Sequence, residues 1–155
     1  MSIKLFVMDV DGTLTDGKIY MDSKGEICKV FNVKDGYAIH ELLRNNQVKT
    51  AIMTGRESKA VEMRAKELEV DYCLQGVKNK LEKLQKLAEE IGISMESVAF
   101  IGDDIPDLEC IQACGYSACP SDAALKVRNS AKYVCRVAGG YGAVREYVEI
   151  LLNES

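Results

Sequence analysis

Two carboxylates, separated by one residue, follow the first apolar run of this sequence. The run Ile3–Met8 predicts a buried strand, and Asp9 and Asp11 come directly after it, before Gly12. In an open α/β sheet, ligands bind beyond the carboxyl ends of the strands, so we expect both carboxylates at an active-site rim. Carboxylates that lie so close repel each other unless a cation or a proton lies between them. The alternative is an ordinary strand-end turn, in which Asp and Gly are common.

Polar residues also follow two later predicted strands and begin a predicted helix. They are Thr54, Gly55 and Arg56 after the strand Val48–Met53, Lys80 at the start of the helix Lys80–Ile91, and Asp103, Asp104 and Asp107 after the strand Val98–Ile101. Each group alone is also explained by a turn, a solvated helix start or a helix cap. Their occurrence in order at successive strand ends is hard to attribute to chance, and it predicts one shared site.

Phosphoryl transfer is the chemistry that needs this set of residues. A carboxylate nucleophile, Asp9, can form an aspartyl-phosphate. Mg²⁺ prefers oxygen ligands, which Asp9, Asp103 and the backbone carbonyl of Asp11 would supply. The Thr54 hydroxyl and the Lys80 ammonium would hold the remaining phosphate oxygens. The second carboxylate, Asp11, can protonate the leaving alcohol and then activate water.

Predicted strands and helices alternate along most of the chain. Besides the elements named above, helices are expected over Tyr37–Asn46, Lys59–Leu68, Leu108–Ala113 and from Val144 onward, and strands near Asp71–Leu74, Tyr116–Cys119 and Tyr133–Val137. Such βα alternation favours an α/β fold with a mainly parallel sheet that is covered on both faces. We expect a single domain over residues 1–155.

One segment, at about residues 18–31, interrupts the alternation. The β-prone stretches Lys18–Met21 and Glu26–Val30 are separated by the turn residues Asp22–Gly25, which predicts a β-hairpin just after the paired aspartates. An isolated two-stranded hairpin is marginally stable, so we expect its apolar residues to pair with other subunits. No connection is long enough for a cap domain.

The composition is that of a soluble globular protein and excludes several functions. The 20 basic and 24 acidic residues give a net charge of −4, which offers no reason to expect nucleic acid or a membrane as a partner. We expect a cytoplasmic protein, because no signal peptide is visible and the six cysteines can serve as small hydrophobic thiols. None of them forms a Cys-x-x-Cys pair, which argues against structural zinc.

The ordered motifs resemble those of the haloacid dehalogenase superfamily. They are Asp9–Thr13, Thr54, Lys80 and Gly102–Asp107. The resemblance implies a Rossmann-like three-layer core, Mg²⁺ as cofactor, Asp9 as nucleophile and Asp11 as general acid/base. It also implies that Asp9, Asp11 and Asp103 surround the metal, with Asp104 and Asp107 in support.

Three further segments resemble the capless subgroup of octulosonate 8-phosphate phosphatases. They are Thr15–Gly17, Phe31–Tyr37 and Ala138–Glu146. This narrower resemblance implies a homotetramer in which a neighbouring subunit helps to close each active site. It also implies a 2-keto-3-deoxy sugar acid phosphate as substrate, bound by Thr54, Gly55, Arg56 and Lys80, with Arg64 adding positive charge.

The exact sugar is less well defined by the sequence. Arg56 favours the eight-carbon acid, 3-deoxy-D-manno-octulosonate 8-phosphate, because it resembles the octulosonate enzymes, in which an arginine at this position meets the sugar acid, whereas a glutamate would resemble the nine-carbon type. An arginine can also pair with the carboxylate of such an acid. Tyr141, which replaces an arginine of that subgroup, and the short tail after the last predicted helix favour a nine-carbon sugar acid 9-phosphate. A catalytically silent scaffold is a remote alternative. A signalling receiver domain is excluded, because its phosphorylated aspartate would follow a middle strand, where this chain has Thr54.

Overall fold

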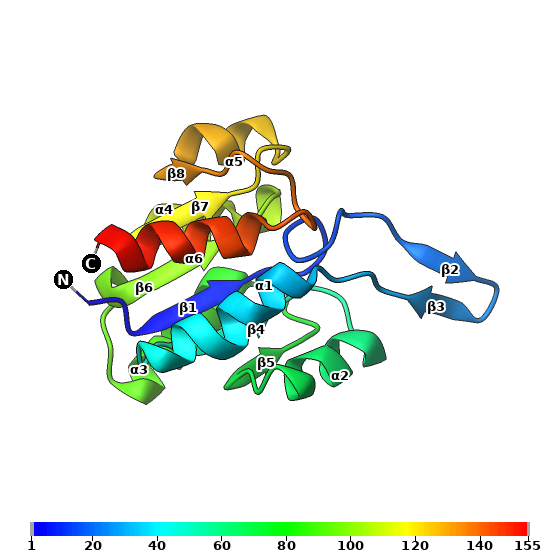
Figure 1. Ribbon diagram of the computed structural model, residues 1–155, viewed down its shortest axis with the longest axis horizontal. Helices are drawn as coiled ribbons and strands as arrows, with labels where there is room; N and C mark the ends of the chain where they lie inside the picture. The colour runs from blue at the N-terminus through cyan, green and yellow to red at the C-terminus, as the bar shows by residue number, and fades with distance from the viewer. Residues whose placement is uncertain (1, 155) are drawn as a thin grey trace.

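A six-stranded parallel sheet forms the centre of the molecule, and a two-stranded hairpin stands apart from it (Figure 1). The computed structural model describes residues 2–154. The sheet has the order β5-β4-β1-β6-β7-β8, and the antiparallel hairpin consists of β2 and β3. The strands are β1 (Leu5–Met8), β2 (Tyr20–Asp22), β3 (Gly25–Cys28), β4 (Lys49–Met53), β5 (Tyr72–Leu74), β6 (Val98–Ile101), β7 (Tyr116–Cys119) and β8 (Tyr133–Val134).

Helices cover both faces of the sheet, which gives the predicted three layers. The helices are α1 (Val33–Tyr37), α2 (Lys59–Glu67), α3 (Lys80–Ile91), α4 (Leu108–Ala113), α5 (Leu125–Ser130) and α6 (Ala143–Glu154), with a π-helical turn η1 (Ala38–Leu43) and 3-10 turns η2 (Met95–Ser97) and η3 (Ile105–Asp107). None of the helices among the described residues has the length and apolar character that a membrane crossing requires.

Alternating side chains of β1 divide the core into two hydrophobic clusters. Phe6 and Met8 pack with apolar residues of η1, α2 and α6 on one face. Leu5 and Val7 pack with residues of α3, α4 and α5 on the other. Because β1 is fully buried on both faces, it forms the continuous apolar run that a central parallel strand requires.

The connections reverse direction around β1, which creates the crevice for the site. From β1 the chain runs outward through β4 to β5, then crosses to β6 on the other side of β1 and continues to β7 and β8. Strands β4 and β6 both pair with β1, so the carboxyl ends of all three meet at one edge. Ligands of open α/β sheets bind at such a topological switch point.

Three elements differ from the sequence-based prediction. Helix α1 begins at Val33, four residues earlier than expected, because the Asn32 side chain accepts a hydrogen bond from the Lys34 amide and caps it. Helix α5 was not predicted, since its six residues are too few to show a helical period. Strand β8 ends at Val134 rather than at Val137.

The hairpin forms where it was predicted and projects away from the layered core (Figure 1). Its turn is closed by the Asp22 side chain, which accepts a hydrogen bond from the Lys24 amide at 2.8 Å. Apolar side chains on it are exposed to solvent, among them Met21, Ile27 and Val30. Among residues 2–154, no further element forms a cap over the sheet edge.

One carboxylate of the core contributes a pH-dependent term to stability. Asp35 in α1 is 1% exposed, and its Oδ1 accepts a hydrogen bond from the Arg145 amide at the start of α6. Burial raises the pKa of Asp35 from 3.8 to about 6, although this hydrogen bond and the charges of Arg64 and Arg145 oppose the increase. Between these values the unfolded chain releases a proton that the folded chain retains, so Asp35 lowers the free energy of unfolding as pH rises.

We therefore expect Asp35→Asn to change the pH dependence of unfolding. The free energy of unfolding of the variant, minus that of the wild type, should increase by on the order of 2 kcal/mol from about pH 4 to about pH 7. Urea unfolding at fixed protein concentration across this pH range measures the difference. The exposed Glu90→Gln on α3 is the control and should give a flat difference. A flat difference for Asp35→Asn would contradict the assignment.

Candidate active site

Asp9 lies where the central strand reaches the edge of the sheet. It follows β1 directly, and its amide donates a hydrogen bond to the Ile101 carbonyl at 3.1 Å, which ties it to the end of β6. The residue is 7% exposed. The chain then turns sharply at Gly12, whose φ of +88° lies in the left-handed region that glycine tolerates best. This turn leaves the Asp9 side chain at the bottom of a cleft.

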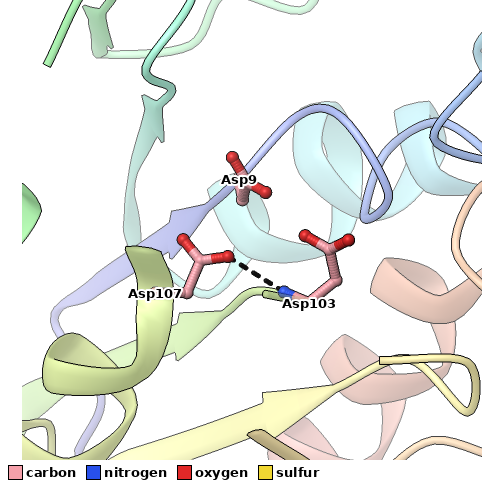
Figure 2. Close-up of side chains that lie close together, drawn as sticks. All are labelled: Asp9, Asp103 and Asp107. Atoms are coloured by element: carbon pink, nitrogen blue, oxygen red, sulfur yellow. Dashed lines mark hydrogen bonds between the residues drawn. The ribbon is translucent and has the colours of Figure 1, made fainter. Parts of the chain in front are cut away.

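Three carboxylates converge at this point (Figure 2). One oxygen from each of Asp9, Asp103 and Asp107 lies within 4.8 Å of the others. Asp107 stands at the end of η3, and its Oδ2 accepts hydrogen bonds from the amides of Asp103 and Asp104 at 3.0 and 3.3 Å. Asp104 caps the same turn through its own side chain. The loop after β6 is thus folded around Asp107, which orients Asp103.

A buried ammonium group links two of the three carboxylates. The Lys80 Nζ lies 2.9 Å from the Asp9 Oδ1 and 2.7 Å from the Asp107 Oδ1, and the residue is 6% exposed. Asn79 places it there, because its side chain caps α3 by accepting a hydrogen bond from the Glu82 amide. Burial would lower the pKa of Lys80, but the charges of Asp9 and Asp107 outweigh burial and raise it. Lys80 is therefore a permanent cation.

The remaining negative charge makes this cluster suited to a divalent cation. Burial raises the pKa of Asp103, and the neighbouring Asp9 and Asp107 raise it further. Burial and Asp9 raise the pKa of Asp107 in the same way, although Lys80 opposes this. A hard cation would remove this repulsion, and carboxylate oxygens are the ligands that Mg²⁺ prefers. Since both oxygens of Asp107 already accept hydrogen bonds, Asp9 and Asp103 are the better direct ligands.

Asp11 points to a different set of partners. Its Oδ1 lies 2.7 Å from the Lys29 Nζ, and its Oδ2 lies 3.8 Å from the Arg56 Nε. The Asp11 side chain is therefore not part of the three-carboxylate cluster, although it lines the same cleft. This separation gives the two members of the Asp-x-Asp pair different surroundings, one beside a lysine of the core and one beside a lysine of the hairpin.

The predicted site residues line one cleft of about 310 Å³, with one exception. Its walls include Asp9, Asp11, Thr54, Gly55, Arg56, Lys80, Asp103, Asp104 and Asp107. Thr54 is buried at the end of β4, whereas the Arg56 side chain is 54% exposed at the mouth. Arg64 lies outside this cleft: its guanidinium stacks on Phe31 and pairs with Glu67 beside a neighbouring cavity.

Sequence analysis did not select Lys29 as a site residue. It follows β3, where neither the alternation of the hairpin nor any motif marks it as different from the exposed Lys24. Only the fold of the hairpin over the loop after β1 reveals the contact with Asp11, 18 residues earlier in the chain. The one sequence signal for this contact was the position of the predicted hairpin, because a hairpin that follows the paired aspartates along the chain begins beside them.

Fold and site together define a haloacid dehalogenase-like hydrolase. The family model described as haloacid dehalogenase-like hydrolase matches residues 74–146. Over 151 residues, 97% of this chain and 80% of the relative, the sequence is 44% identical to the 3-deoxy-D-manno-octulosonate 8-phosphate phosphatase KdsC of Escherichia coli K12. It is 40% identical over 97% of its length to that of Yersinia pestis, which it covers to 80%. The chain therefore belongs to the family of 3-deoxy-D-manno-octulosonate 8-phosphate phosphatases.

Solved structures of such phosphatases closely match this fold. The enzyme from Moraxella catarrhalis, in complex with magnesium, phosphate and KDO, superimposes with a TM-score of 0.94 at 40% identity, covering 97% of this chain and 86% of that one. The cobalt-bound enzyme from Haemophilus influenzae gives 0.94 at 36% identity, covering 98% and 88%. Magnesium in the former agrees with the carboxylate cluster described above.

We expect Asp103→Asn to weaken Mg²⁺ binding while the fold is retained. Removing an outer-shell partner of a metal ligand already costs about 10- to 100-fold in affinity, so loss of a direct carboxylate should cost on the order of 100-fold or more. Calorimetric titration with MgCl₂ measures the affinity, and circular dichroism checks the fold. The exposed Asp22→Asn in the hairpin should bind as the wild type does. Equal affinities for Asp103→Asn and wild type would place the metal elsewhere.

Proposed function

We propose that this chain is a Mg²⁺-dependent phosphatase that hydrolyses 3-deoxy-D-manno-octulosonate 8-phosphate through an aspartyl-phosphate on Asp9. The observation that carries the proposal is the position of Asp9, which is buried at the end of β1 between Lys80 and Asp103 and lines the cleft. The identity of 44% to a phosphatase of this substrate supports the choice of sugar.

In the proposed first step, a carboxylate oxygen of Asp9 attacks phosphorus and the bond to the ester oxygen breaks. Asp11 gives a proton to that oxygen, so the sugar leaves as a neutral alcohol. In the second step a water attacks the phosphorus of the aspartyl-phosphate and passes a proton to Asp11. The bond between phosphorus and Asp9 breaks, which releases inorganic phosphate and restores the Asp9 carboxylate and the protonated Asp11.

The other residues of the cleft would hold the phosphoryl group. The Thr54 hydroxyl and the Gly55 amide follow β4 and line the cleft, as does the Lys80 ammonium. Asp9, Asp103 and the main-chain carbonyl of Asp11 would hold Mg²⁺, with Asp104 and Asp107 shaping the loop. When bound, Mg²⁺ supplies positive charge that stabilises the phosphoryl oxygens.

Arg56 is the residue that we propose binds the carboxylate of the sugar acid. Its guanidinium is more than half exposed at the mouth of the cleft, where the part of the substrate beyond the phosphate would lie. A guanidinium can form two parallel hydrogen bonds with a carboxylate, which a 2-keto sugar acid carries. A contact between Arg64 and the substrate stays a prediction, since Arg64 lines the neighbouring cavity.

We further propose a homotetramer in which a neighbouring subunit helps to close each cleft. The hairpin exposes Ile19, Tyr20, Met21, Ile27 and Val30, which is more apolar surface than a free two-stranded hairpin is expected to present. A cleft without a cap is open to water, and a second subunit would exclude this water.

We also propose a cytoplasmic location, because the six cysteines are free thiols and a reducing compartment keeps thiols in that form.

Phosphate release from a panel of esters with Mg²⁺ tests the substrate. The panel contains 3-deoxy-D-manno-octulosonate 8-phosphate, two nine-carbon sugar acid 9-phosphates and hexose phosphates. We expect the highest kcat/KM for the eight-carbon acid, and an Arg56→Met variant should lose that preference through KM. A preference for a nine-carbon acid would retain the mechanism and change the substrate.

Asp9→Asn should abolish turnover, and a near-normal rate in this variant would exclude the aspartyl-phosphate.

Light scattering coupled to size exclusion tests the assembly. We expect the mass of a tetramer for the wild type, and a smaller species for the double variant Met21→Lys and Ile27→Lys, because charge opposes burial of the hairpin. Leu125→Lys, an exposed apolar position on α5 outside the hairpin, is the matched control and should remain tetrameric. An active wild-type monomer would contradict the proposal.

A further inference from the structure

The Lys29 side chain is largely shielded from solvent although the residue is only partly buried and follows a strand of the exposed hairpin. Its side chain is 4% exposed, and its Nζ lies 2.7 Å from the Asp11 Oδ1 and 2.8 Å from the Glu26 Oε1. Removing a lysine from water costs several kcal/mol unless its charge is paired. The hairpin thus places an ammonium group, paired with two carboxylates, against Asp11, which the proposed function makes the acid and base.

The contact with Asp11 is anchored on both the hairpin and the core. Glu26 of β3 accepts a hydrogen bond from the Ser58 hydroxyl at 2.5 Å through its second oxygen, and Ser58 is the N-cap of α2. The Ser58 amide donates to the Gln75 side chain at 2.8 Å. A chain of polar contacts therefore runs from the layered core through Glu26 to Lys29 and ends at the Asp11 oxygen.

The environment of Lys29 and Glu26 stabilises the charged form of each side chain. Burial would lower the pKa of Lys29, but the hydrogen bonds to Asp11 and Glu26 outweigh burial and raise it. Burial would raise the pKa of Glu26, but the hydrogen bonds from Lys29 and Ser58 outweigh burial and lower it. Both shifts favour the charged forms, so Lys29 faces Asp11 as an ammonium group.

Lys29 approaches Asp11 from outside the catalytic cleft. It is absent from the residues that line the 310 Å³ cleft, and it lies instead at the edge of the neighbouring cavity with Phe31 and Arg64. It therefore holds one oxygen of Asp11 from behind. The second oxygen lies 3.8 Å from the Nε of Arg56, which lines the cleft.

We infer that Lys29 is a positioning residue that fixes the Asp11 carboxylate for proton transfer to the leaving oxygen, and that the hairpin is thereby part of the catalytic apparatus. The inference rests on the proposed function, because it requires Asp11 to act as the general acid. It assigns no contact between Lys29 and the substrate. The inference predicts that loss of Lys29 slows the first step more when the leaving group depends more strongly on protonation.

Two aryl esters that differ in leaving group test this consequence. Phenol is a more basic leaving group than 4-nitrophenol, so phenyl phosphate depends more on a general acid, and neither ester carries a sugar acid. We measure release of the phenol in a single turnover with Mg²⁺, which reports the first step alone. Lys29→Met should lower the rate for phenyl phosphate by about 30-fold and that for 4-nitrophenyl phosphate by less than about 3-fold, which is a partial loss of the roughly 10²- to 10⁴-fold that a general acid contributes.

Three further variants connect the effect to Asp11. Lys29→Met added to Asp11→Asn should cause no further loss, because residues that act through one group are not additive. Lys29→Arg keeps the charge and should restore the wild-type ratio between the two esters. Lys24→Met removes an exposed lysine of the same hairpin and should leave both rates unchanged.

The outcomes separate this inference from the proposed function. Equal losses on the two esters for Lys29→Met, or an additional loss in the Asp11→Asn background, would overturn the role of Lys29 while the active wild type still supports the phosphatase. If Lys29→Met unfolds, as judged by circular dichroism, Glu26→Gln removes the anchor instead and should shift the ratio in the same direction. A wild type that releases neither phenol and also fails to hydrolyse 3-deoxy-D-manno-octulosonate 8-phosphate would overturn both the function and the inference.

Discussion

Charge balance around Asp9 is the constraint on which the rest of the site depends. The buried carboxylates of Asp9 and Asp107, the partly buried carboxylate of Asp103 and the Lys80 ammonium leave two negative charges in one small volume when all are ionised. Such a cluster is unstable unless protons or a cation compensate, and burial together with the neighbouring Asp9 and Asp107 accordingly raises the pKa of Asp103. A divalent ion matches the deficit, so the same arrangement that is unfavourable alone becomes a magnesium site and a place where a phosphate can bind.

The backbone brings these charges together through close contacts that leave no room for side chains. A Cβ on Gly12 would meet the Asp103 carboxylate at 1.9 Å, so the loop after β1 packs directly on the loop after β6. A Cβ on Gly139 would meet the Gly12 carbonyl at 1.9 Å in turn. The segment before α6, more than 120 residues later, thus supports the loop that carries the paired aspartates. This close packing explains why Gly139 has no room for a side chain.

The sequence predicted what depends on local patterns and on sheet topology. Apolar runs marked β1 and β6, and the polar residues after them were expected at one edge because parallel strands end together. It did not predict that Arg64 turns toward Phe31 and Glu67, or that Lys29 reaches Asp11. Those contacts depend on how the hairpin and α2 pack, which is tertiary information that no residue spacing contains.

The hairpin combines two demands that differ in chemistry. Its apolar residues Met21, Ile27 and Val30 face solvent in the single chain, whereas Lys29 and Glu26 turn their charges toward the site. A two-stranded hairpin has little stability of its own, so the position of Lys29 is only as well defined as the packing around the strands. Burial of the apolar side in an assembly would therefore also fix the lysine behind Asp11, and subunit association and proton transfer would share one structural element.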